Sequence, residues 1–284
     1  MKLVGGVETP ALESGPRVIS RRHELADGLS RDYGVHPYGK WRGAFWRLLS
    51  LVDLGVESGH PGAALAASQT LDWVANPRRL AAIHKRRIDG RVRRCATQDG
   101  LALYACLRIG LRAEPRLDSL AESLVETQWP DGGWNCDVRP QVTHSSFNET
   151  WGPTLGLAAY GAGEAVANAA GFLLRHRVVF SHRTGELAHP VFLKLRYPPY
   201  WHYDLLVGLR TLAASTRLAD ARTADALDIV ESKRRPDGTW HTEGRWWKRP
   251  GSKGSNVEAI DWGDAANQIL TEQAESVLHL AGRL

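Results

Sequence analysis

Apolar residues recur along most of this chain at positions i, i+3, i+4 and i+7, which is the spacing of an amphipathic helix. Few segments show the strict alternation of a strand. Five helical segments carry a charged face, and we expect them at 17–29, 60–75, 115–128, 163–176 and 219–234. Five others are more apolar and richer in small residues, and we expect them at 40–54, 97–110, 147–160, 202–214 and 265–282.

The two kinds of segment alternate, so they pair into about five helical hairpins in series. A helix that is apolar on all sides lies inside a fold, whereas an amphipathic helix covers it. The pattern therefore predicts an all-α protein with two rings of helices. Inner helices such as 97–110 are enclosed by outer helices such as 115–128.

Short glycine-centred loops recur between the hairpins. Residues 128–134 read Gln-Trp-Pro-Asp-Gly-Gly-Trp, and residues 234–240 read Arg-Arg-Pro-Asp-Gly-Thr-Trp. A weaker copy at 181–187 lies halfway between them, and a fainter one ends at 90–92. A period of about fifty residues indicates a repeated supersecondary unit. Pro-Asp-Gly favours a turn, so we expect each tryptophan to fill the gap between hairpins and Gln128 to bond an adjacent helix end.

The frame of Gln128, Gly132 and Trp134 resembles the QW repeat of squalene and hopene cyclases. The related repeat of protein prenyltransferase β subunits is similar. This resemblance covers about 40–282. It implies an α/α toroid, in which the inner helices surround an apolar pocket lined by aromatic side chains.

Within the chain, we expect one toroid domain over 16–284. Residues 1–15 are rich in Gly, Pro and Glu and are expected to form a flexible tail. The chain has no run of eighteen apolar residues, so we expect no transmembrane segment. The N-terminus lacks the pattern of a secretory signal.

The motifs that carry the chemistry of this superfamily are missing. The chain has no Asp-Asp pair, so it lacks the Asp-x-Asp-Asp motif with which cyclases protonate an alkene. The zinc motif Asp-x-Cys of the prenyltransferases is also absent, because Cys136 and Asp137 stand in the opposite order. Residues 200–203 do resemble the stretch that supplies the zinc-binding histidine. The resemblance therefore leaves the cofactor unknown.

Polar residues at the predicted starts of the inner helices are candidates for catalysis. Asp99, Glu149 and His202 align at these starts, and Asp204 lies beside them. Free backbone N–H groups attract carboxylates at helix starts, so a capping role is one interpretation. The other is that the residues meet in one pocket, where burial would raise the pKa of Glu149 or Asp204 and let it act as a general acid.

Aromatic residues and one histidine are candidates for binding an apolar substrate. They precede or begin the inner helices and comprise Trp151, Tyr200, Trp201, Tyr203, Trp262 and His144. Such residues could form a wall around a hydrophobic ligand or a carbocation. The alternative is that they pack beneath a rim loop. The basic loop 244–255 could cover the same mouth or remain a plain surface loop.

A thiol and two imidazoles suggest a metal site as a further alternative. Cys136, His144 and His202 could bind zinc together with Asp137 or Glu149. Their spacing matches no standard zinc pattern. The three cysteines of the chain do not suggest a disulfide scaffold, which favours a cytoplasmic protein.

Charge and composition exclude few other classes. The net charge is +5, but the arginines are scattered and do not predict nucleic-acid binding. A local cluster at 85–94 is either a solvated surface or an anion site. Three functions therefore stay open: an enzyme acting on an isoprenoid or other apolar molecule, a non-catalytic toroid that binds a ligand or partner, and a metal-dependent enzyme. The oligomeric state is not predicted.

Overall fold

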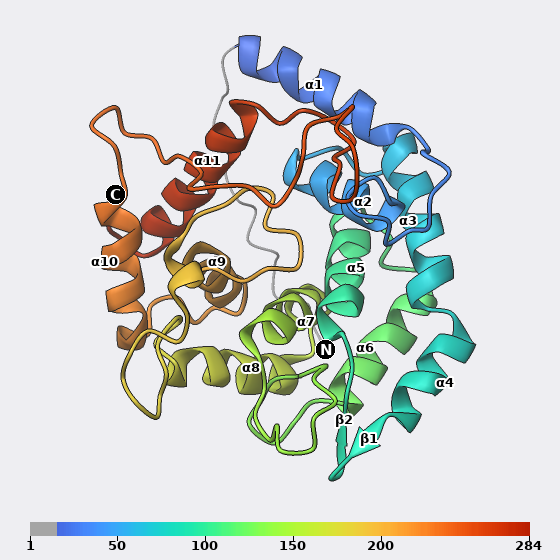
Figure 1. Ribbon diagram of the computed structural model, residues 1–284, viewed down its shortest axis with the longest axis vertical. Coiled ribbons are helices and arrows are strands. Elements are labelled where there is room, and N and C mark those ends of the chain that lie inside the picture. Colours follow the sequence, from blue (N-terminus) through green and yellow to red (C-terminus); the bar gives the residue numbers. More distant parts are fainter. Residues whose placement is uncertain (1–15) are drawn as a thin grey trace.

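The computed structural model describes residues 16–284 and is mostly helical there, as predicted. The expected tail at 1–15 lies outside the described residues. In Figure 1 the helices nearer the middle of the view are α2 (Ala44–Asp53), α5 (Ala96–Arg108), α7 (Phe147–Tyr160), α9 (Leu205–Ala214) and α11 (Ala265–Leu280). At the periphery lie α1 (Pro16–Ser30), α3 (Pro61–Val74), α6 (Arg116–Glu126), α8 (Gly163–Arg175) and α10 (Ala224–Ser232).

The central helices contact one another in chain order, from α2 through α5, α7 and α9 to α11. Each of α3, α6, α8 and α10 packs against a central helix. Among residues 16–284, no helix combines the length and the apolar character that crossing a membrane would require.

The helix bounds follow from local chemistry. Helix α7 begins at Phe147 because the Ser146 side chain accepts the backbone N–H of Glu149, and it ends at Gly161, whose φ of 98° suits glycine. Helix α9 begins at Leu205, three residues after the predicted start at 202, because the Asp204 carboxylate caps it at the N–H of Val207.

One helix and one hairpin have no counterpart among the elements expected from the sequence. Helix α4 (Pro77–Lys85) begins after Asn76, whose side-chain oxygen accepts two backbone N–H groups of the first turn. Strands β1 (Arg87–Ile88) and β2 (Arg91–Val92) then pair antiparallel. Gly90, which belongs to the faint fourth loop copy, lies in the turn of this hairpin with a φ of 76°.

The two clear loop copies make equivalent contacts. The Trp134 indole N–H donates to the carbonyl of Leu124 (3.0 Å), in the last turn of α6. The Trp240 indole N–H donates to the carbonyl of Val230 (2.7 Å), in the last turn of α10. Both rings are fully buried. Each indole N–H therefore satisfies a carbonyl at a helix end. That the two rings fill the gap between neighbouring hairpins stays a prediction.

The side chain of Gln128 links adjacent units, as predicted. Its amide nitrogen donates to the carbonyl of Gly132 in its own loop and to the carbonyl of Ala165 in α8, both at 2.8 Å. The end of α6 is thereby tied to the first turn of α8.

Helices α5 and α7 approach each other more closely than side chains would allow. A Cβ atom added at Gly100 would lie 2.2 Å from the backbone nitrogen of Pro153, and one added at Gly156 would lie 2.3 Å from the carbonyl oxygen of Gly100. Only glycine permits this distance between the two backbones. The glycine contact fixes the relative position of the N-terminal ends of α5 and α7, where the candidate site lies.

Candidate functional site

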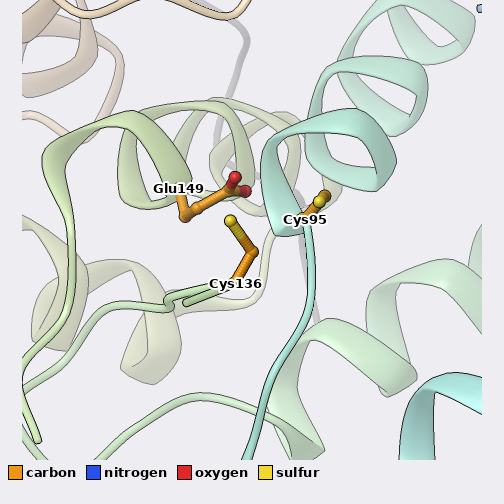
Figure 2. Close-up of side chains that lie close together, drawn as sticks. All are labelled: Cys95, Cys136 and Glu149. Carbon is orange, nitrogen blue, oxygen red and sulfur yellow. The ribbon is translucent and has the colours of Figure 1, made fainter. Parts of the chain in front are cut away.

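Two thiols and one carboxyl group come together where α5 and α7 begin. Cys95 is the N-cap residue of α5, Glu149 lies in the first turn of α7, and Cys136 follows the Trp134 loop. One potential ligand atom from each of the three lies within 4.8 Å of the others. Figure 2 shows the Cys136 thiol directed toward the Glu149 carboxyl group, with Cys95 on the neighbouring helix end.

Backbone hydrogen bonds hold these three residues in place. The N–H of Arg94 donates to the carbonyl of Asn135 (3.1 Å), which sets the residues before Cys95 and Cys136 side by side. The N–H of Ser146 donates to the carbonyl of Trp134 (2.9 Å), so the loop that carries Cys136 closes onto the start of α7.

The Glu149 carboxyl group is buried, with 9% of the residue exposed. Burial raises its pKa to about 7, although the backbone N–H of Thr97 donates to Oε2 at 3.0 Å and opposes this shift. The Thr97 hydroxyl in turn donates to the carbonyl of Asn148. The start of α5 therefore holds the carboxyl group in a fixed orientation.

The two thiols of the cluster differ in pKa and in solvent exposure. The neighbouring Cys136 thiol lowers the pKa of Cys95, and the neighbouring Cys95 thiol raises the pKa of Cys136. Cys95 is exposed and Cys136 is partly buried. The third cysteine, Cys106, is buried in α5, and burial raises its pKa to about 12. The cluster thus contains one exposed thiol with a lowered pKa, whereas Cys106 is a core residue.

The donor set suits a soft or borderline metal ion. Two thiolates bound to one tetrahedral zinc ion lie about 3.8 Å apart, so small side-chain rotations would bring these atoms to that geometry. Catalytic zinc sites use three protein ligands and leave a fourth position open. Cys95, Cys136 and Glu149 supply three ligands, and the exposure of Cys95 leaves one side accessible.

The other predicted acids have structural partners. Asp99 is fully buried and ion-paired with Arg94 and with Arg79, whose Nη1 lies 2.7 Å from a carboxylate oxygen. Asp204 caps α9 by accepting the N–H of Val207 at 2.9 Å, and burial raises its pKa to about 6. Of the acids predicted for catalysis, only Glu149 joins the thiols.

The histidines of the predicted metal set do not join the cluster. Among the described residues, the Cys95, Cys136 and Glu149 group is the one set of three metal-binding side chains that comes together, and it contains no histidine. His144 is exposed. His202 stacks between Trp201 and Trp246 at ring distances of 3.9 and 3.7 Å, and burial lowers its pKa to about 4. The structure therefore brings Cys136 together with Cys95 and Glu149 and not with His144 and His202.

The rings of the predicted aromatic wall pack in separate groups against other parts of the fold. Tyr200 stacks on Trp41 at 3.6 Å, and its hydroxyl donates to the buried carboxylate of Glu258. Trp262 is fully buried against Tyr197.

Two further members of that wall are anchored to backbone carbonyls. The Trp151 indole donates to the carbonyl of Trp201 (3.3 Å), and the Tyr203 hydroxyl donates to that of Val178 (2.7 Å). These contacts give the rings a structural role. That the rings also face a ligand stays a prediction.

Sequence reasoning missed Cys95 as a member of the site. The available signal was its position directly before α5, which corresponds to the position of Ser146 before α7. Cys95 and Cys136 are far apart in sequence, and the backbone hydrogen bond between Arg94 and Asn135 brings them side by side.

A surface pocket of about 250 Å³ lies elsewhere, between the β1–β2 hairpin and the Trp129 loop. It is lined by basic and acidic side chains, including Arg87, Arg91 and Glu126.

Comparison of the chain with protein-family models, curated proteins and solved structures gives no match.

Proposed function

We propose that this protein is a zinc-dependent enzyme whose metal is held by Cys95, Cys136 and Glu149. The observation that supports this most strongly is the convergence of two thiols and a buried carboxyl group within 4.8 Å. The three residues come from three separate segments that independent backbone contacts hold together. A structural core does not require such a donor set.

Each protein group has a defined task in this proposal. Cys95 and Cys136 would hold the metal as thiolates, and Glu149, which the N–H of Thr97 already orients, would be the third ligand. This ligand role replaces the general-acid role that the sequence suggested for Glu149. A zinc ion bound there would act as a Lewis acid on an oxygen or sulfur group of the substrate in the open position.

We also propose that the helices form an α/α toroid of the QW-repeat type. Support comes from the central helices that follow one another in chain order and from the equivalent contacts of Trp134 and Trp240. Thr150 in α7 and Thr271 in α11 bond the backbone N–H groups of these two tryptophans, at 3.4 and 2.9 Å. Such equivalence is what a repeated unit produces.

For the substrate, we propose an isoprenoid or another apolar molecule. This rests on the resemblance of the loops to the QW repeat and on the aromatic residues near the starts of α7 and α9. The alternative of a non-catalytic binding toroid makes a different prediction, because it needs no metal.

Metal analysis of purified protein tests the proposed function. The full chain, produced without a metal-binding tag, is expected to contain one equivalent of zinc by inductively coupled plasma mass spectrometry. Cys95→Ser, Cys136→Ser and Glu149→Ala are each expected to lower zinc affinity at least tenfold. Cys106→Ser is the matched control and should retain zinc, because Cys106 lies in the core of α5. Equal zinc content in all four variants would refute the assignment.

A further inference from the structure

The same cluster contains the two thiols needed for a disulfide. The sulfur atoms of Cys95 and Cys136 lie within 4.8 Å of each other. Cys95 is exposed, so a small oxidant can reach it from solvent. No other pair of cysteines is available, because Cys106 is buried within α5.

The backbone favours this pairing. The bond from the N–H of Arg94 to the carbonyl of Asn135 joins the residues directly before the two cysteines. Arg94 is itself fixed, since it is buried and bonds Asp99 and the side chain of Thr127 (2.8 Å). Disulfides require Cα atoms within about 7 Å, a condition that residues beside a direct backbone hydrogen bond can meet.

We propose that peroxide oxidises Cys95 and Cys136 to a disulfide and thereby releases the metal from the site. The Cys95 thiolate attacks one oxygen of hydrogen peroxide, the O–O bond breaks, and a sulfenic acid and hydroxide form. The Cys136 thiolate then attacks the Cys95 sulfur, the S–O bond breaks, and a second hydroxide leaves. Two protons convert the hydroxides to water, so two thiolates lose two electrons and one peroxide gains them.

Loss of the metal follows from the ligand count. A disulfide removes two of the three ligands, and Glu149 alone cannot hold a zinc ion tightly. A dithiol reductant such as dithiothreitol reverses the reaction by thiol–disulfide exchange and restores both thiols. The site would then be active when reduced and inactive when oxidised. This release of metal rests on the proposed function, whereas the disulfide does not.

The test treats the zinc-loaded full chain with hydrogen peroxide and follows two signals. A chromogenic chelator reports free zinc, and non-reducing peptide mass spectrometry reports the linkage. We expect stoichiometric zinc release together with a Cys95–Cys136 disulfide, both reversed by dithiothreitol and added zinc. Cys106→Ser should behave like the wild type, and Cys136→Ser should form no internal disulfide. Glu149→Ala keeps both thiols and should still form the linkage.

The outcomes separate the two proposals. Zinc-loaded protein that keeps its metal under peroxide, or that gives a sulfinic acid at Cys95 without the linkage, overturns the redox switch and leaves the zinc enzyme standing. Protein that never binds zinc overturns the proposed function and the release of metal with it. In that case the peptide map still reports whether Cys95 and Cys136 pair.

Discussion

The contact between α5 and α7 gives a sharp test of how the site is built. Replacing Gly156 with alanine would put a methyl group 2.3 Å from the carbonyl oxygen of Gly100, whereas real Cβ atoms essentially never come under 3.0 Å. The obstacle is backbone, so no side-chain rotation relieves it. The two helices must separate, and the starts that carry Cys95 and Glu149 must move with them.

Two opposing effects determine how much Gly156→Ala changes the stability of the protein. Overpacking of a tight core costs about 1–3 kcal/mol. Alanine in place of glycine in a helix interior contributes about 1 kcal/mol of stability. Because the clash is with rigid backbone, we expect Gly156→Ala to destabilise the protein by about 2 kcal/mol and to lower Tm by roughly 4 °C. Zinc affinity should fall as well, since the ligands separate.

The matched control is Gly171→Ala in α8. A Cβ atom there meets only the end of the Arg175 side chain, at 3.6 Å. This variant should be more stable than the wild type by up to about 1 kcal/mol and should keep full zinc affinity. Urea unfolding and zinc competition with a chelator measure both effects. Should Gly156→Ala be as stable as Gly171→Ala, the close approach of α5 and α7 would be wrong.

Three further predictions concern the rest of the fold. Burial raises the pKa of Glu258 from 4.5 to about 7, so the folded state binds this proton more tightly than the unfolded state. The free energy of unfolding should therefore fall by up to about 3 kcal/mol as pH rises through that range. Glu258→Gln should flatten this pH dependence in urea unfolding. Asp204→Ala should lower the free energy of unfolding by about 1 kcal/mol by removing the N-cap of α9, while Asp204→Asn should change it little. Equal losses of stability in the two variants would argue against a capping role. Trp134→Phe and Trp240→Phe should each lower the free energy of unfolding by about 1–3 kcal/mol, because each leaves a helix-end carbonyl without its indole donor. Calorimetry measures this change, and a loss of stability at one position alone would argue against equivalent units.

The helices were predictable because local patterns determine them. The spacing of apolar residues placed α7 at 147–160 without error in its bounds. Helix α4 was missed because it has only nine residues and none of them is buried; the Asn76-Pro77 start was a signal for it. Loop chemistry also predicted the link from Gln128 to an adjacent helix.

The site was only half predictable, because it depends on contacts between distant segments. Cys136 and Glu149 lie close in sequence and were both candidates. His144 lies between them in sequence, yet its side chain points to solvent, so proximity along the chain did not place it in the cluster. Cys95 joins through the α5–α7 glycine contact and one backbone hydrogen bond, which no periodic pattern reveals.

X-ray absorption spectroscopy at the zinc edge tests the central claim most directly. On the reduced, zinc-loaded chain, we expect two sulfur ligands at about 2.3 Å and oxygen ligands at about 2.0–2.2 Å. The Cys95→Ser variant should show one sulfur fewer if it still holds metal. A spectrum with imidazole ligands and no sulfur, or no bound zinc at all, would contradict the assignment of Cys95, Cys136 and Glu149.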